Sequence, residues 1–280
     1  MPAEQEVNWR YAICNELFAG WSLEKTAAYV AGAGYQGLEL APFTLCDRVT
    51  DLPAAERRQI RQTIEGAGLA VAGLHWLLAR TQGLQLNDPD PAVRERTTQY
   101  LLALIDFCAD LGGEVLVFGS PQQRNLRPGW SREQAWQSTV ESMARCGQRA
   151  QAQGVVFCFE PLSRRETDFV ATVDEAIDLV RQVNQPGFQL MVDVKAMAQD
   201  PRPVVEQIRL AYPFCQHVHV NDPNLSGPGM GEVDFRPILA ALKALGYARW
   251  LSVEVFDFSP GPERIARESL ANLKEALNEL

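Results

Sequence analysis

Two of the three histidines in this 280-residue chain lie in one short stretch, residues 214–222, in which they alternate with β-branched valines. A β-strand fits this stretch, and because side chains alternate between the two faces of a strand, His217 and His219 share a face. His219 is nearer the polar end formed by Asn221 and Asp222, which makes it a candidate metal ligand at a strand mouth. Three other apolar runs carry an acid near the same end: Glu160, Asp193 and Glu254.

Each of these four residues has an ordinary interpretation when it is taken alone. A strand-terminal acid is most often a helix N-cap or an ion-pair partner, and a strand histidine is usually a hydrogen-bonded core group. Three carboxylates and an imidazole at corresponding ends of four strands, however, would repel one another and lose hydration unless a cation gathered them. The pattern therefore predicts one divalent metal, with Mn²⁺ or Mg²⁺ favoured by the hard oxygen ligands and Co²⁺ or Zn²⁺ as substitutes.

The elements that must position these residues alternate along the whole chain. Strands are predicted at residues 11–14, 37–40, 70–75, 115–118, 155–160, 188–193, 214–219 and 250–254. Helices are predicted from about residue 22 onward after the first strand, and then at residues 53–66, 91–111, 131–152, 172–184, 202–211, 234–245 and 261–278. Their starts carry capping residues, such as Ser22, the pair Thr172 and Glu175, and Asp234.

Strands and helices that alternate in this way, without a long linker, are typical of a single (β/α)8 TIM barrel. We expect this domain to span residues 1–280, with residues 1–9 as a flexible tail. In a barrel the carboxyl ends of the strands converge on one mouth, so the four candidate ligands would meet there. A doubly wound open sheet is the alternative fold, but no GxGxxG or GxxxxGK[ST] loop follows any predicted strand.

Composition narrows the class of partner. The formal net charge is −9 and the pI is about 5.0, so neither nucleic acid nor an anionic membrane surface is expected as a partner. The six cysteines form no CxxC pair, which is typical of reduced thiols in a cytoplasmic protein. No apolar run reaches the roughly 18 residues that suggest a membrane span. A small neutral or polar substrate is expected, and association with further copies of the same chain stays open.

Two motifs carry a resemblance to a known family. The run from Glu160 to Thr167 resembles an E-x-L-N-R-x-E-T signature, with Ser163 in the asparagine position, and residues 217–219 match an H-x-H motif. The chain thus resembles the xylose isomerase-like TIM-barrel superfamily, the sugar phosphate isomerase/epimerase group, and is similar to ketose 3-epimerases and hydroxypyruvate isomerases. The resemblance implies a small polyhydroxylated carbonyl substrate. It also implies that Glu160 is both metal ligand and acid/base, that Glu166 contacts substrate and that His219 is a ligand.

The chain departs from the family pattern at two positions. Ala196 stands where the ketose epimerases usually carry a substrate-binding histidine, and Leu225 stands where they usually carry an arginine. Lys195 is the obvious substitute, because an ammonium at the mouth could bind an anionic or enolic oxygen, although an ion pair with a ligand acid is an equal alternative. Further candidates for substrate binding near the mouth are His75, Glu39 and Arg164, and an apolar wall could come from Trp76, Phe118 and Phe256.

The constellation implies proton abstraction next to a carbonyl through a metal-stabilised enediolate. Glu160 and Glu254 would flank the carbon, giving epimerisation if each addresses one face and aldose-ketose isomerisation if one carboxylate shuttles the proton. An inosose-type dehydratase or lyase, or a sugar-binding barrel without catalysis, are the alternatives. An endonuclease is disfavoured, because its trinuclear zinc site needs more histidines than the three present.

Overall fold

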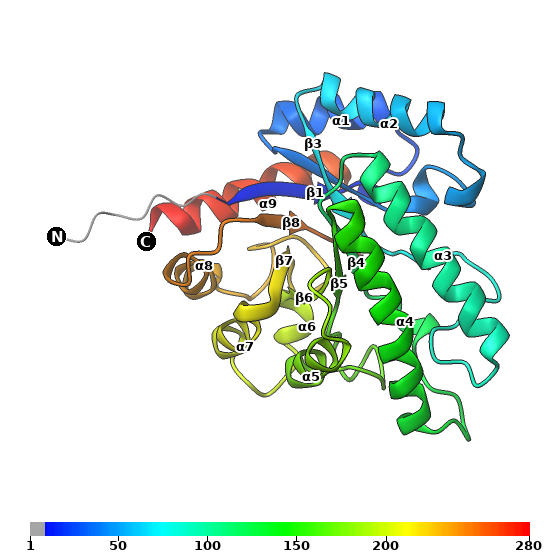
Figure 1. The fold of residues 1–280 in the computed structure, drawn as a ribbon. Helices are drawn as coiled ribbons and strands as arrows, with labels where there is room; N and C mark the ends of the chain where they lie inside the picture. Colours follow the sequence, from blue (N-terminus) through cyan, green and yellow to red (C-terminus); the bar gives the residue numbers. More distant parts are fainter. Residues whose placement is uncertain (1–8) are drawn as a thin grey trace.

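Eight parallel strands close into a barrel in the computed structural model, which describes residues 9–280. Each strand pairs with its neighbours in chain order, and β1 pairs with β8 to close the ring (Figure 1). The predicted TIM barrel is confirmed, and the predicted strand ends are correct to within one or two residues. The strands are β1 (Arg10–Cys14), β2 (Gly37–Leu40), β3 (Ala70–Leu74), β4 (Val115–Phe118), β5 (Val156–Phe159), β6 (Phe188–Asp193), β7 (Cys215–Val220) and β8 (Trp250–Val253).

Helices follow the strands and surround the barrel (Figure 1). All eight predicted helices are present, and one short helix, α6, was not predicted. The helices are α1 (Leu23–Ala33), α2 (Ala54–Gly66), α3 (Pro91–Asp110), α4 (Arg132–Gln153), α5 (Val173–Val183), α6 (Val194–Met197), α7 (Val204–Ala211), α8 (Phe235–Ala244) and α9 (Pro262–Asn278). Short 3₁₀ helices occur in the loops, and the one after β1 is η1 (Asn15–Phe18).

Side-chain caps fix several helix starts where the sequence predicted them. The Ser22 hydroxyl accepts a hydrogen bond from the Lys25 amide at the start of α1, and the Asp234 carboxylate does the same for α8. At α5 the Thr172 hydroxyl accepts from the Glu175 amide, but the Glu175 carboxylate accepts from the Ala171 amide, one residue before the position that a capping box uses.

The amino-terminal segment differs from the prediction at its last residue. Trp9 was assigned to a flexible tail, yet it is only 7% exposed and its indole N–H donates to the Tyr11 hydroxyl over 2.9 Å. A side chain of this size is anchored by the apolar area that it buries. The remainder of the predicted tail, residues 1–8, lies outside the described residues.

The amino-terminal end of the barrel interior is filled by Trp250. Its ring is fully buried against Ala12 and Ala72, and a Cβ atom at Gly37 would lie 2.7 Å from the ring. Glycine at position 37 is therefore required for the indole to fit. The Arg10 guanidinium stacks on the same ring at 3.9 Å. Because side chains close this end, the carboxyl-terminal mouth is left to hold a ligand.

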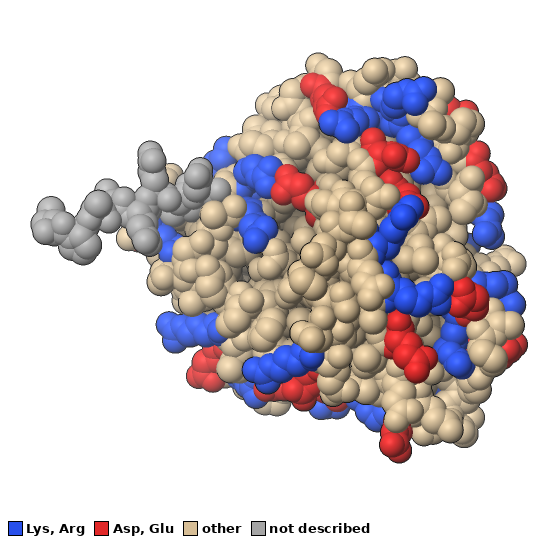
Figure 2. Space-filling model, viewed as in Figure 1, with Lys and Arg blue, Asp and Glu red and all other residues tan. Residues whose placement is uncertain are grey.

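The surface carries charges of both signs. On the face shown in Figure 2, lysine and arginine side chains alternate with aspartate and glutamate, and ion pairs such as Arg149 with Asp106 link neighbouring helices. Pairs of this kind, exposed to water, contribute little to stability. Among the described residues, no helix combines the length and the apolar character that crossing a bilayer requires.

Candidate active site

The four predicted metal ligands meet at the carboxyl-terminal mouth of the barrel. Glu160 follows β5, Asp193 ends β6, His219 lies in β7 and Glu254 follows β8. Each can offer one ligand atom such that all four atoms lie within 4.8 Å of one another, and every one of these side chains is buried. Closure of the barrel brings the four strand ends together. Within the sheet, the register places Asp193 directly beside His219. These four residues are called the quartet below.

Glu39 in β2 determines how His219 faces the quartet. The Glu39 carboxylate lies 2.8 Å from Nε2 of His217 and 3.1 Å from Nε2 of His219, and all three side chains are fully buried. Burial by itself would raise the pKa of Glu39, but the two imidazoles hold it well below its usual range. An ionised carboxylate can only accept hydrogen bonds, so both Nε2 atoms carry hydrogen.

Nδ1 of His219 therefore points into the quartet, where it has no hydrogen-bond partner among the described residues. It lies 3.1 Å from Glu254 Oε2, without the alignment of a hydrogen bond, and 4.0 Å from Asp193 Oδ2. Burial would lower the pKa of His219, but Glu254 and Glu39 raise it well above its usual value, so Nδ1 faces carboxylates that favour either a proton or a metal cation on it. This orphaned atom and the three hard oxygen donors fit a divalent metal, and a carboxylate behind the ligand histidine is the usual support for one.

The quartet is also electrostatically unbalanced. Burial, followed by the charges of Glu254 and Asp193, raises the pKa of the Glu160 carboxyl to about 8. Burial also raises the pKa of Asp193, despite the nearby Lys195. At Glu254 the outcome is opposite: burial would raise its pKa, but the adjacent His219 lowers it below its usual value. Excess negative charge in a water-poor site is what a cation would neutralise.

Neighbouring groups fix the orientation of two quartet carboxylates. Asp193 accepts hydrogen bonds from the Ala196 amide over 2.6 Å and from Asn221 Nδ2 over 2.6 Å. The bond from the Ala196 amide also makes Asp193 the N-cap of α6. The Trp76 indole N–H donates to Glu254 Oε1 over 2.9 Å. Both acids are thus oriented before any ligand binds, which is the requirement for a precise metal site.

A cavity of about 320 Å³ opens above the quartet, a volume in the range of small-molecule sites. Glu160 and Glu254 lie in its wall, together with Glu166, Lys195 and the aromatic residues Trp76 and Phe256. The Lys195 ammonium forms an ion pair with the Glu166 carboxylate and lies 4.4 Å above the Phe256 ring. A small polar molecule with one apolar edge matches this lining.

Comparison with known proteins agrees with this geometry. The model of a family described as "Xylose isomerase-like TIM barrel" matches residues 27–276. The chain belongs to this family. It is 28% identical over 253 residues to the D-psicose 3-epimerase of Ruminiclostridium cellulolyticum, covering 85% of this chain and 82% of the relative. It is 24% identical over 247 residues to the L-ribulose 3-epimerase of Mesorhizobium japonicum, covering 88% and 80%.

Solved structures agree on the fold. A D-psicose 3-epimerase of Clostridium cellulolyticum H10, crystallised with D-tagatose, has a TM-score of 0.83 at 22% identity, covering 96% of this chain and 99% of that one. A family 2 AP endonuclease of Brucella melitensis has a TM-score of 0.72 at 17% identity, covering 89% and 93%. At these identities the likeness concerns the fold alone. The curated relatives are epimerases, which are isomerases, and the prediction of an isomerase is confirmed to that extent.

The xylose isomerase-like chain described here places Lys195 and Glu166 together, a pairing that the sequence left open. Burial would lower the pKa of Lys195, but Asp193 and Glu166 raise it, so the ammonium is charged. The Ser163 hydroxyl, which stands in the asparagine position of the family signature, donates to Glu166 over 2.8 Å. Both Lys195 and Glu166 line the cavity, as their predicted contact with substrate requires.

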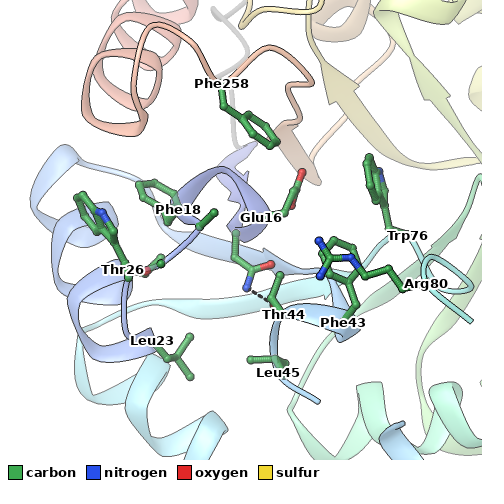
Figure 3. A pocket seen from close by; sticks show the side chains of 14 residues that line it. Glu16, Phe18, Leu23, Thr26, Phe43, Thr44, Leu45, Trp76, Arg80 and Phe258 are labelled. Atoms are coloured by element: carbon green, nitrogen blue, oxygen red, sulfur yellow. Dashed lines mark hydrogen bonds between the residues drawn. The ribbon is translucent and has the colours of Figure 1, made fainter. Parts of the chain in front are cut away.

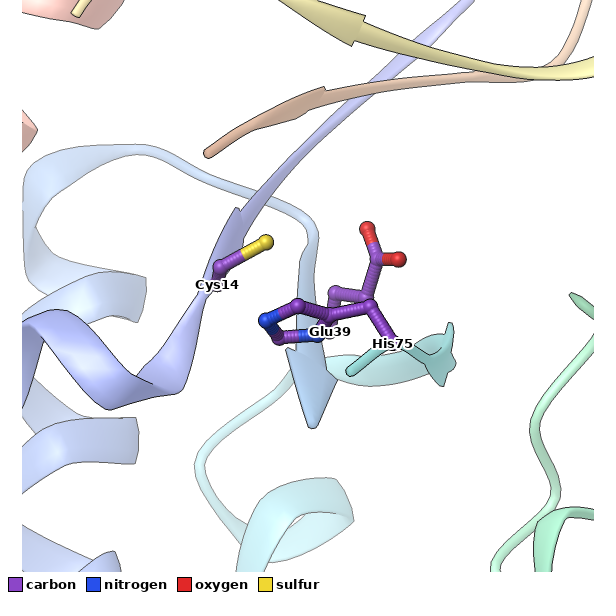
Figure 4. A group of neighbouring side chains, drawn as sticks. All are labelled: Cys14, Glu39 and His75. Atoms are coloured by element: carbon purple, nitrogen blue, oxygen red, sulfur yellow. The ribbon is translucent and has the colours of Figure 1, made fainter. Parts of the chain in front are cut away.

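Three other predicted substrate contacts do not line this cavity. Glu39 is fully buried beneath the quartet with both oxygens bonded to histidines, and His75 is fully buried with its Nε2 2.8 Å from Glu16 Oε2. Figure 4 shows these two side chains next to Cys14. Arg164 is exposed and is absent from the cavity wall. Strand-end position therefore did not predict access to this cavity for Glu39 and His75, and a place in the signature after β5 did not predict it for Arg164.

Other contributors were not found from the sequence. Arg124, in the loop after β4, is fully buried, and its guanidinium donates to the backbone carbonyls of Glu160 over 2.8 Å and Val170 over 3.3 Å. Gly119 lies so close to the site that a Cβ atom there would be 2.3 Å from Glu160 Oε2. Asn221 could have been found, because a polar residue directly after a ligand strand is a signal for support of the site.

Proposed function

We propose that this chain is a metal-dependent epimerase of ketoses, acting at the carbon next to the carbonyl. The observation that carries the proposal is the buried quartet, two of whose carboxylates, Glu160 and Glu254, also line the cavity above it. The names of the curated relatives, which include D-psicose and L-ribulose 3-epimerases, support a ketose as substrate. They also favour epimerisation over dehydration.

One divalent metal, with Mn²⁺ preferred, would be held by Glu160, Asp193, His219 and Glu254. When bound it would polarise the substrate carbonyl and lower the pKa of the neighbouring C–H bond. The hard donor set and the unpartnered Nδ1 of His219 support this assignment.

The chain's own acids would move the proton. Glu160 follows β5 and Glu254 follows β8, so the two carboxylates approach the cavity from different strands of the ring. Two acids placed in this way can address both faces of a planar enediolate, one removing the proton and the other returning it. The Trp76 indole restrains Glu254, and the absence of a side chain at Gly119 leaves space for the Glu160 carboxylate.

Lys195 and Glu166 would bind hydroxyl or enolic oxygens of the substrate. Their ion pair lies in the cavity wall and offers both donors and acceptors. This pair would bind the substrate hydroxyls in place of the histidine and the arginine that the family pattern has at positions 196 and 225. Leu225 has an exposed fraction of 45% and Ala196 is a buried methyl group, and neither lines the cavity.

Solvent exchange tests the proposal directly. Wild-type protein with Mn²⁺ and D-fructose or D-psicose in D₂O should incorporate deuterium at the carbon beside the carbonyl, which NMR detects. Glu160→Gln and Glu254→Gln should lose exchange by several orders of magnitude while keeping metal, because an amide oxygen can still ligate. Glu114→Gln, at the other end of the barrel, is the matched control. Exchange at the wild-type rate in both variants would exclude this acid/base pair.

A further inference from the structure

A second cavity, of about 410 Å³, lies beside the mouth and is lined in part by five aromatic residues. The aromatic residues of its wall are Phe18, Trp21, Phe43, Trp76 and Phe258. Figure 3 shows four of them, Phe18, Phe43, Trp76 and Phe258, around a central space. The proposed reaction of a simple ketose needs only the first cavity. A second space of this size and character requires a different explanation.

The second cavity contains a buried carboxylate with a free oxygen. Glu16, in η1, is 4% exposed and lines the cavity, and Figure 3 shows its carboxylate between Phe258 and Trp76. Oε2 of Glu16 lies 2.8 Å from Nε2 of His75, whereas Oε1 has no hydrogen-bond partner among the described residues. A buried acceptor without a partner is costly and rare, so such an oxygen points to a donor that the protein itself does not supply.

Glu16 is also close to the quartet. Ligand atoms of Glu16, His75 and Glu254 lie within 4.8 Å of one another. The Glu16 carboxylate therefore lies within reach of a molecule that occupies both cavities. A substrate held beside Glu254 would have to extend only a short distance to present a donor to Glu16.

Two residues are shared by the walls of both cavities, Trp76 and Arg80. Both have positive φ angles, 51° for Trp76 and 61° for Arg80, a conformation that bulky side chains rarely adopt. The Trp76 ring stacks on Phe256 of the first cavity at 6.0 Å and contacts Phe43 of the second at 5.8 Å. Strained backbone is retained mainly at functional sites, and here it holds the two residues through which the cavities adjoin.

We propose that the second cavity is an accessory subsite for an apolar, preferably aromatic, substituent on the ketose, which carries next to its apolar part an O–H or N–H group that donates to Glu16 Oε1. The aromatic walls supply stacking, and the free oxygen selects for the donor. This inference rests on the proposed function for the sugar half of the ligand. It assigns to the chain a preference for substituted over simple ketoses.

Fragment binding tests the subsite without turnover. Benzyl alcohol carries a ring and a donor, whereas benzyl methyl ether carries the ring alone. Titrations followed by NMR should show the alcohol binding wild-type protein about tenfold more tightly than the ether, as the loss of a hydrogen bond to a charged acceptor requires. Glu16→Gln keeps an oxygen for His75 and turns an N–H toward the cavity, so this preference should disappear or reverse.

Phe258→Ala removes one wall of the subsite at a position that is already 40% exposed, so the fold should tolerate it. Both fragments should bind about tenfold more weakly in this variant. Leu210→Ala, at an apolar residue 44% exposed on α7, is the matched control and should bind as wild type does. Equal fragment binding in wild type and Phe258→Ala, or an ether as tight as the alcohol in wild type, would overturn the subsite.

Turnover completes the test. D-fructose and its benzylamino-substituted derivatives at C1 and at C6 are compared in the D₂O exchange assay. The ratio of kcat/KM for the better derivative to that for D-fructose should fall about tenfold in Phe258→Ala and stay constant in Leu210→Ala. Fragment binding without any ketose exchange would overturn the proposed function alone, and exchange without fragment binding would overturn the subsite alone.

Discussion

The Glu39 carboxylate should control metal affinity although it contacts no metal. It holds His217 over 2.8 Å and His219 over 3.1 Å, so a single buried acid fixes two imidazoles. In Glu39→Gln one oxygen remains and the other position becomes an N–H₂ group. The shorter contact favours keeping the oxygen toward His217, which leaves the amide hydrogens facing Nε2 of His219.

His219 would then have to accept at Nε2 and carry its proton at Nδ1, the atom that faces the quartet. Losing one hydrogen bond to a charged acceptor costs about 1.5–3 kcal/mol, which corresponds to about 10- to 10²-fold in an equilibrium constant. The same range is typical of residues that support metal ligands. We therefore expect Glu39→Gln to weaken Mn²⁺ binding about 10- to 10²-fold.

Calorimetric titration of metal-free protein with Mn²⁺ measures this effect, and circular dichroism melting shows whether the variant is folded. Glu114→Gln changes an acid that pairs with Arg10 at the other end of the barrel, and it should bind Mn²⁺ with wild-type affinity. A folded Glu39→Gln variant whose Mn²⁺ affinity stays within twofold of wild type would refute the role of Glu39 in orienting His219.

Three further results are expected. Removing metal with a chelator should abolish deuterium exchange into ketoses and lower Tm, and Mn²⁺ at about 100 times its Kd should restore about 2.7 kcal/mol of stability; exchange that survives full chelation would contradict a metal-dependent reaction. Lys195→Met should reduce kcat/KM for D-psicose about 10²-fold through loss of a charged contact, whereas unchanged kinetics would make the ion pair with Glu166 purely structural. Gly119→Ala should displace the Glu160 carboxylate and lower exchange about 10- to 10²-fold with little change in Tm, while Gly32→Ala, where a Cβ meets no atom within 4 Å, should leave exchange unchanged.

The parts of the molecule that could be predicted from the sequence are those set by local patterns and by topology. Strand and helix periodicities are local, and the caps at Ser22 and Asp234 mark helix starts within a few residues. The quartet was predictable for a different reason. Once the strands alternate with helices, barrel closure brings their carboxyl ends together, however far apart they lie in the chain.

The supporting residues were harder to predict because their roles depend on depth within the barrel. Glu39 is the third residue of β2 and lies one layer beneath the mouth, a difference that a strand-end pattern does not resolve. His75 is withdrawn from the mouth by Glu16, a residue 59 positions earlier in the chain. Arg124 comes from an irregular loop, and its carbonyl acceptors lie 36 and 46 residues away. Such contacts are fixed by tertiary packing, which no periodicity in the sequence records.

The two departures from the family pattern acquire a physical meaning in this arrangement. With Ala196 buried and Leu225 on the surface, neither position supplies the imidazole or the guanidinium that the family pattern uses to bind hydroxyls. The groups that can bind substrate oxygens include the Lys195 and Glu166 pair in the first cavity, Arg80 in the wall of both cavities and, in the second cavity, the Glu16 carboxylate. Five aromatic side chains share the second wall with Glu16, so the loss of hydroxyl contacts at positions 196 and 225 is accompanied by aromatic surface. A ketose that carries an apolar substituent in place of a hydroxyl suits a site with fewer hydroxyl-binding groups and more aromatic surface. A small free ketose would leave the aromatic surface without a contact.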